Sequence, residues 1–297
     1  MLSCYQVDVR KMLKKLSGKT LVILCLFFAA QPVFLSAQVN DPFSAMDRIF
    51  KQAENAPTPE EEYFFGRAVA ANILTAYRPY TRNNELTDYL NLICQALVVN
   101  SSLPAAYNGY HVMILRGREF NAFATPGGHI FVTRGLVNAA PCEDALAGII
   151  AHELAHIMLR HGMKMVDDMK LSGEIDEMAL RAASFSSKND SRILAFRDSV
   201  NDFFYNMVKN GYSAQQEFEA DAAAVKLLAA AGYSPGKLLE MLNILQKIQH
   251  NQKGGFNNTH PSPSQRIANV ERQMMSYKLQ DTSSIRQDRF FSITGRK

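Results

Sequence analysis

The sequence predicts one α-rich α+β domain in which a small antiparallel sheet lies beside a long apolar helix. Two observations support this fold class. Apolar residues recur at helical spacing over most of the chain after residue 60, whereas three short β-rich runs lie together between residues 111 and 133. The chain has 297 residues, of which 47% are hydrophobic, so a sizeable core is available. We find no internal repeat and no linker long enough to separate two domains.

Residues 1–37 are predicted to form a secretory signal peptide. They hold five basic residues and one acidic residue, while the rest of the chain has 27 of each, so the net charge of +4 belongs to this segment alone. An apolar run at 21–30 follows the bases and is short for a membrane span, and Ala37 suits cleavage. We therefore expect export, with anchoring to a membrane if the leader is retained. The charge indicates no nucleic-acid partner.

The domain itself is predicted to begin at residue 60, after a lead-in segment at 38–59. A helix is expected from Glu60, because Pro59 precedes it and acidic residues in its first turn complement the helix dipole. A second amphipathic helix is expected over residues 84–99.

Three short runs with β-rich composition follow, and Gly117 and the Pro126-Gly-Gly segment separate them. Turn residues between short strands favour hairpins, so we expect an antiparallel sheet. The runs are His111–Arg116, Asn121–Ala124 and His129–Thr133.

Beyond Pro141 the pattern is helical almost to the end of the chain. A helix is expected over 143–162, then a long helical stretch that is broken by polar residues at 184–190. Ser213 and Gln216 form a capping box that opens another helix. Further helices are expected from Ser234 and over 261–277, followed by a mobile, polar and basic tail at 278–297.

Two cysteines, Cys94 and Cys142, remain once the leader is removed. An exported protein permits one disulfide between them, but two separate buried thiols are an equally good interpretation, because the sequence does not show how close they are.

The most specific motif is His152-Glu-Leu-Ala-His156, in the middle of the helix predicted over 143–162. Residues four apart lie on one face of a helix, so both imidazoles can reach one zinc ion, and Glu153 can take a proton from a water beside it. The alternative is a pair of histidines on a solvent-exposed helix. The apolar residues on both sides of the motif argue against that alternative.

A hydrolytic zinc site needs a third protein ligand, and the helix that opens at Ser213 offers one. Glu217 and Asp221 lie one turn apart on the same face, so Glu217 can bind the metal while Asp221 accepts the free N–H of a ligating histidine. Glu219 points elsewhere. Taken alone, an acidic first turn is explained by dipole complementarity, but the upstream pair of histidines favours the ligand interpretation.

These motifs together resemble the gluzincin metallopeptidase family that includes the CaaX prenyl protease, HtpX and BepA. The resemblance rests on H-E-x-x-H followed by E-x-x-A-D, on the N-A-F-A-x-P-G-G-x-I-x-V segment at 121–132, and on the T-H-P segment at 259–261 with Arg266-Ile267. It covers about 60–277 and implies a zincin-like metallopeptidase domain there. The chain is similar to compact exported BepA-like members, without a tetratricopeptide array or multiple membrane spans.

The resemblance implies one Zn²⁺ per chain, held by His152, His156 and Glu217, with Glu153 as general base and then acid. It also implies a role for His260, either as a gate at the open zinc position or as an oxyanion group, and a contact from Arg266 to the site. His161 is expected to be structural rather than a ligand. Substrate would pair with the strand that begins at Asn121, Ala122 and Phe123.

The implied function is a zinc-dependent endopeptidase that acts on misfolded or stalled envelope proteins, most naturally in the bacterial periplasm. Its partners would be protein or peptide substrates. The alternative is a latent or chaperone-like binding module whose zinc is capped by His260. An aminopeptidase is disfavoured, because we find no residue set that would bind a substrate N-terminus.

Overall fold

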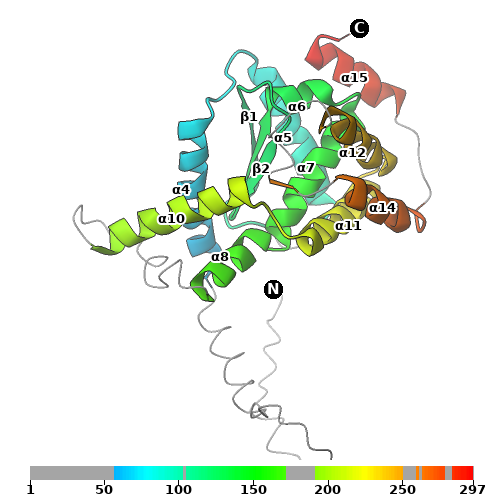
Figure 1. Cartoon of the computed structure of the whole chain (residues 1–297). Coiled ribbons are helices and arrows are strands. Elements are labelled where there is room, and N and C mark those ends of the chain that lie inside the picture. The colour runs from blue at the N-terminus through cyan, green and yellow to red at the C-terminus, as the bar shows by residue number, and fades with distance from the viewer. Residues whose placement is uncertain are drawn as a thin grey trace, which may run out of the picture. The chain divides into compact units, whose positions relative to one another are not determined.

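Helices surround a small sheet in the computed structural model, which describes residues 57–102, 105–171, 191–249, 259–260, 263–277 and 283–296 (Figure 1). The predicted signal peptide, the lead-in segment up to residue 56 and the predicted break at 184–190 lie outside these residues. The α-rich α+β class is confirmed. Among the described residues, no helix combines the length and the apolar character that a membrane span requires.

The sheet has three strands in the order β1-β3-β2, where β1 is His111–Leu115, β2 is Ala122–Thr125 and β3 is His129–Thr133. β2 and β3 pair antiparallel, as their short connection predicts, but β1 and β3 pair parallel. The expectation of a wholly antiparallel sheet is therefore wrong. After β1 the chain forms β2 two strand positions away. β3 then enters between them and runs in the same direction as β1.

The turn between β2 and β3 fixes the sheet against the first helix, α4 (Pro59–Ala76). Gly127 and Gly128 have φ angles of 77° and 115°, which glycine adopts without strain. On the helix side, a Cβ atom at Gly66 would lie 1.6 Å from the carbonyl oxygen of Pro126. The close approach of helix and turn therefore requires glycine on both sides.

Helix α7 (Glu143–Met158) is the centre of the larger hydrophobic core, and all of its residues are buried. It packs against α5 (Asn84–Val99), α11 (Ala214–Ala230) and α12 (Gly236–Gln249). The short α6 (Arg134–Ala139) joins β3 to this region. A helix that is apolar all round must be covered on every face, which the surrounding helices achieve.

A second core lies between α4, the sheet, α8 (His161–Leu171) and α10 (Ser191–Lys209). The predicted helix over 143–162 is in fact two helices, because α7 ends at Met158 and α8 begins at His161. Arg160, between them, has a left-handed φ of 56°. Here the sequence prediction was wrong, since it placed the helix end at Gly162.

The C-terminal segment is not a free tail where the structure describes it. α14 (Pro263–Met274) packs against α11 and α12, and residues Ser284–Thr294 then form α15. Phe290 is fully buried, Arg286 donates to Asp144 at 2.7 Å, and Arg289 pairs with Glu143. The prediction of a mobile tail over 278–297 is thus corrected for 283–296, because its arginines find buried acidic partners at the start of α7.

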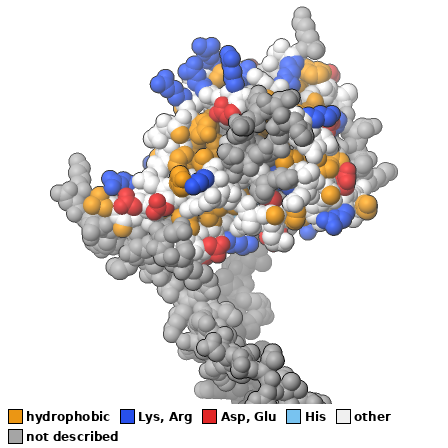
Figure 2. Space-filling view, in the orientation of Figure 1, with side chains coloured by type: hydrophobic (Ala, Val, Ile, Leu, Met, Phe, Trp, Pro, Cys, Tyr) orange, Lys and Arg blue, Asp and Glu red, His pale blue; other side chains and the backbone are white. Residues whose placement is uncertain are grey.

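Cys94 and Cys142 are both buried free thiols, so the disulfide alternative is excluded in this structure. Positive side chains gather over one end of the molecule, around the connection between α4 and α5 (Figure 2), where Arg78 and Arg82 are exposed. The positive charge of the described residues is therefore concentrated on part of the face that Figure 2 shows.

Candidate metal centre

Two imidazoles from α7 form the base of the site. His152 and His156 lie one helical turn apart, and their Nε2 atoms are 3.1 Å from each other. Both side chains are buried, because α7 is covered on all sides. The two imidazoles therefore turn their Nε2 atoms toward one point.

Helix α11 brings a carboxylate to the same point. Ser213 caps the helix through the predicted capping box with Gln216, which places Glu217 in the first turn. The Glu217 oxygens lie 3.3 Å from Nε2 of His152 and 3.3 Å from Nε2 of His156. Burial opposes ionisation of Glu217, but His260 and Arg266 outweigh it and hold its pKa well below the usual range.

His260 completes a cluster of four. Its Nδ1 atom is 2.8 Å from Oε1 of Glu217 and 3.4 Å from Nε2 of His152. One ligand atom from each of His152, His156, Glu217 and His260 lies within 4.8 Å of the others. Burial would lower the pKa of His260, but the carboxylates of Glu217 and Glu153 outweigh burial and raise it to about 9.

The cluster fits a zinc ion, because imidazole nitrogen and carboxylate oxygen are ligands that zinc prefers and all four residues turn these atoms inward. Burial lowers the pKa of His156 to about 3, so its ring is neutral and its lone pair is available. Glu153, fully buried beside the cluster, has two carboxylate oxygens without a hydrogen bond among the described residues. His260 Nε2 lies 3.4 Å from one of them. The Glu153 carboxylate can therefore accept a hydrogen bond from a further group.

Asp221 and Arg266 support His152 from behind. Oδ1 of Asp221 is 2.9 Å from Nδ1 of His152, as predicted. Arg266 donates to both oxygens of Asp221, at 2.9 and 2.7 Å, and its Nη1 lies 3.1 Å from Oε2 of Glu217. Burial raises the pKa of Asp221, but the guanidinium outweighs burial and lowers it overall. Arg266 therefore contacts the site through these two carboxylates and directly at His152, whose Nδ1 lies 3.1 Å from Nη2 of Arg266.

The three residues predicted to bind substrate lie on or next to β2, one of the two edge strands of the sheet. Asn121, Ala122 and Phe123 are all buried, with exposed fractions of 0–3%. The side-chain oxygen of Asn121 accepts a hydrogen bond from the hydroxyl of Thr259 at 3.0 Å. The residue next to His260 is thus attached to the predicted substrate strand, and the role of that strand stays a prediction.

Two further residues contact the ring of His156, namely Tyr212, which the sequence analysis did not single out, and His161, which it expected to be structural. Tyr212 stacks on its ring, with centroids 4.0 Å apart and planes inclined by 16°, and the Tyr212 N–H donates to the carbonyl of Thr259 at 3.3 Å. His161 places its Nδ1 atom 3.0 Å from Nδ1 of His156. No signal marks Tyr212 in the sequence. His161 was not expected to be a ligand, because an unbroken helix would place it on a different face from His156.

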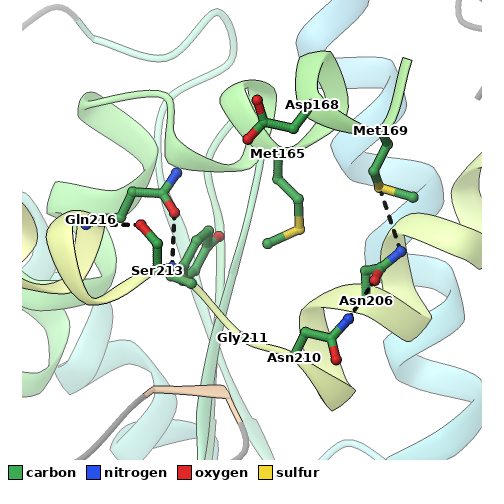
Figure 3. Close-up of a pocket in the computed structure, with 9 residues that line it drawn as sticks. Met165, Asp168, Met169, Asn206, Asn210, Gly211, Ser213 and Gln216 are labelled. Atoms are coloured by element: carbon green, nitrogen blue, oxygen red, sulfur yellow. Dashed lines mark hydrogen bonds between the residues drawn. The ribbon is translucent and has the colours of Figure 1, made fainter. Parts of the chain in front are cut away.

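A cavity of about 380 Å³ lies beside Tyr212, between α8, α10 and the start of α11. In Figure 3, Met169 of α8 accepts a hydrogen bond from Asn206 of α10 on one side of the cavity. Ser213 and Gln216 lie on the other side, and Met165 lies between the two sides. None of the four cluster residues lines this cavity. A second pocket reaches His152, Glu153 and Arg266, but its volume of about 10 Å³ is too small for a peptide side chain. Within the described residues, this pocket leaves no room for a peptide beside the cluster.

A small sheet beside a buried helix with the H-E-x-x-H motif, and a carboxylate from a second helix, define a zinc metallopeptidase domain. Residues 68–274 match the sequence profile of Peptidase family M48, and the chain belongs to that family. The resemblance inferred from the motifs is thus confirmed.

Curated relatives agree with this assignment. A Beta-barrel assembly-enhancing protease of Escherichia coli strain K12 is 24% identical over 200 residues, which cover 65% of this chain and 39% of the relative. A Vibrio cholerae relative with the same kind of name is 26% identical over 269 residues, 87% of this chain and 53% of the relative. Mitochondrial metalloendopeptidase OMA1 of Schizosaccharomyces pombe is 26% identical over 202 residues, 67% of this chain and 54% of the relative. The chain spans about half the length of these relatives, or less.

Proposed function

We propose that the chain is a zinc-dependent endopeptidase with one Zn²⁺ held by His152, His156 and Glu217. The observation that carries the proposal is the convergence of these three side chains from two helices, with donor atoms 3.1–3.3 Å apart and buried. Ligands that rigid helices hold in place are the arrangement that a catalytic metal requires.

When bound, zinc supplies a Lewis acid for the scissile carbonyl and lowers the pKa of a water. The chain supplies the proton transfers. Glu153 lies beside the cluster, and His260 outweighs burial to lower the pKa of its carboxyl, so it is ionised at neutral pH. It takes the proton from the attacking water and passes it to the leaving amine. Asp221 fixes the tautomer of His152 by accepting its Nδ1–H.

We assign protein substrates in the bacterial envelope, namely misfolded or stalled envelope proteins, and export to the periplasm. Two facts support this setting. The first 37 residues have the pattern of a secretory signal peptide. Relatives carry names that refer to beta-barrel assembly. Retention of the leader would anchor the domain to a membrane at one point.

A second candidate is a latent or chaperone-like binder, and the position of His260 favours it. A hydrolytic zinc site keeps one coordination position open, whereas His260 Nδ1 lies within the ligand cluster here. The position of His260 in the cluster is consistent with a latent protease if the residues around His260 move aside. It is consistent with a permanent binder if they do not.

Cleavage of casein by zinc-loaded protein distinguishes the two candidates. For the endopeptidase, the wild type or the His260→Ala variant releases peptides, Glu153→Gln abolishes the cleavage, and Glu271→Gln, a change of the same kind at an exposed position, has no effect. Unfolded-protein binding without cleavage by wild type and His260→Ala would establish the binder instead.

Metal analysis tests the ligand set separately. Glu217→Ala is expected to lose most of the zinc that co-purifies with the wild type, because it removes the only carboxylate of the cluster. A zinc content equal to that of the wild type would refute Glu217 as a ligand.

A further inference from the structure

His161 reaches the metal cluster from behind because of the break between α7 and α8. A continuous helix would place residue 161 some 140° around the axis from His156. The left-handed φ of 56° at Arg160 ends α7, and the chain restarts at His161 as the first residue of α8. The imidazole of His161 thereby returns to His156, with 3.0 Å between the two Nδ1 atoms.

The hydrogen-bond pattern from His156 outward has one consistent arrangement of protons. His156 turns Nε2 toward the cluster, so a metal-binding His156 carries its proton on Nδ1. That proton is donated to Nδ1 of His161. His161 then carries its proton on Nε2, which lies 3.2 Å from Oε2 of Glu219. Each ring nitrogen of His156 and His161 is therefore either a hydrogen-bond donor, a hydrogen-bond acceptor or directed at the cluster.

From this geometry we infer that His161 and Glu219 are positioning residues, which orient the ring of His156 and fix its tautomer for binding of the metal. The inference rests on the proposed metal site. It extends that site by two residues to which neither the motif nor the family match gives a role. It also gives Glu219 a role as the hydrogen-bond acceptor of His161, although its position on α11 directs it away from the cluster.

The two cluster histidines that lie on α7 are thus supported in unequal ways. His152 is supported by Asp221, which is fully buried and held by Arg266. His156 is supported by His161, which is fully buried, and then by Glu219, whose side chain is 40% exposed. Gln215 donates to Glu219 at 2.9 Å, and Lys164 lies 3.8 Å from it. The support of His156 therefore ends at the surface, where a single substitution can remove it without opening the core.

Zinc affinity is the direct readout. We would measure the zinc dissociation constant by competition with a chromogenic chelator for wild type, His161→Phe and Glu219→Ala, in the absence of substrate. Loss of a residue that orients a metal ligand typically weakens affinity by roughly 10-fold to 100-fold. We expect a loss in that range for His161→Phe and a smaller loss for Glu219→Ala. Glu219→Gln, which keeps an acceptor oxygen, should recover part of the loss.

Glu240→Ala is the matched control, because the Glu240 side chain is 41% exposed, also contacts a lysine, and lies on α12 away from the cluster residues. The absorption spectrum of the Co²⁺-substituted protein should change in His161→Phe and Glu219→Ala but not in the control. Thermal unfolding of the zinc-free proteins separates this effect from a general loss of stability.

Zinc dissociation constants within twofold of the wild type for both His161→Phe and Glu219→Ala would overturn the inference. If His161→Phe does not fold, the zinc affinity of Glu219→Ala alone tests the inference, because the Glu219 side chain lies at the surface and its removal leaves the core intact. Failure of the proposed endopeptidase would instead appear as zinc-loaded wild type and His260→Ala that bind the metal normally but do not cleave.

Discussion

The Nδ1 atom of His260 lies 2.8 Å from Oε1 of Glu217, so a residue outside both metal-site helices occupies one side of the ligand cluster. The neighbouring Thr259 is bound to Asn121 and to the backbone of Tyr212. Three contacts therefore hold Thr259 and His260 against the site.

Removal of the His260 side chain is expected to raise proteolytic activity. A hydrogen bond to a charged group contributes about 1.5–3 kcal/mol. His260→Ala should therefore cleave casein roughly tenfold faster than wild type, measured as initial rate at equal zinc content. His111→Ala, at an exposed histidine, is the control and should match the wild type. A lower rate with unchanged zinc would show that His260 assists the reaction, as an oxyanion group would.

Arg266 is expected to be essential for the stability of the site. Its guanidinium is the partner of the buried Asp221 and lies against Glu217. Arg266→Met leaves both carboxylates without that charge, so the free energy of unfolding should fall by about 3–5 kcal/mol. Arg266→Lys should recover only part of this, because lysine cannot bind Asp221 through two nitrogens.

Urea unfolding of the zinc-free proteins measures this effect, with Arg272→Met as the control at an exposed position of the same helix. Equal stability of Arg266→Met and Arg272→Met would mean that the carboxylates do not depend on the guanidinium.

The C-terminal helix α15 is expected to contribute to folding. Phe290 is fully buried, so Phe290→Ala should lower the free energy of unfolding by about 3–5 kcal/mol. Ile285, on the same helix, is 73% exposed, and Ile285→Ala should change the stability by less than about 0.5 kcal/mol. Indistinguishable urea midpoints for the two variants would restore the view that this segment is a free tail.

The buried thiol of Cys94 is expected to be unreactive in the folded protein. Burial raises its pKa to about 12, so at pH 8 the thiolate that reacts with alkylating agents is almost absent. Iodoacetamide treatment followed by peptide mass spectrometry should find Cys94 unmodified in native protein and modified in urea. Modification in the native state within minutes would contradict the burial.

The same shift predicts a dependence of stability on pH. The ordinary thiol pKa is 9.0, below the folded value of about 12. The unfolded state therefore loses its proton first as pH rises. The contribution of Cys94 to stability is complete below pH 9 and decreases between pH 9 and 12.

Local signals in the sequence account for where the candidate ligands lie on their helices. Two histidines four residues apart on a helix must share a face, and the capping box at Ser213 fixes where α11 begins and hence where Glu217 lies. His152, His156 and Glu217 were placed from such rules alone. Their convergence depends on two helices crossing, which the rules do not describe but which the pairing of the two motifs indicated.

The errors arose where distant residues decide the structure. The direction of β1 depends on β3, which enters the sheet between β1 and β2. The order of α15 depends on Glu143 and Asp144, more than 100 residues earlier in the chain. A third error has a local cause. The position of His161 depends on the left-handed φ angle of Arg160, which arginine seldom adopts.

The packing of α15 also sets the limits of a fragment that would fold alone. The family match ends at residue 274, and a protein cut there would keep all of the proposed ligands. It would nevertheless leave Glu143 and Asp144, at the start of the helix that carries His152 and His156, buried without Arg289 and Arg286. The ion pairs that cover the start of α7 therefore come from α15, beyond the segment by which the family is identified.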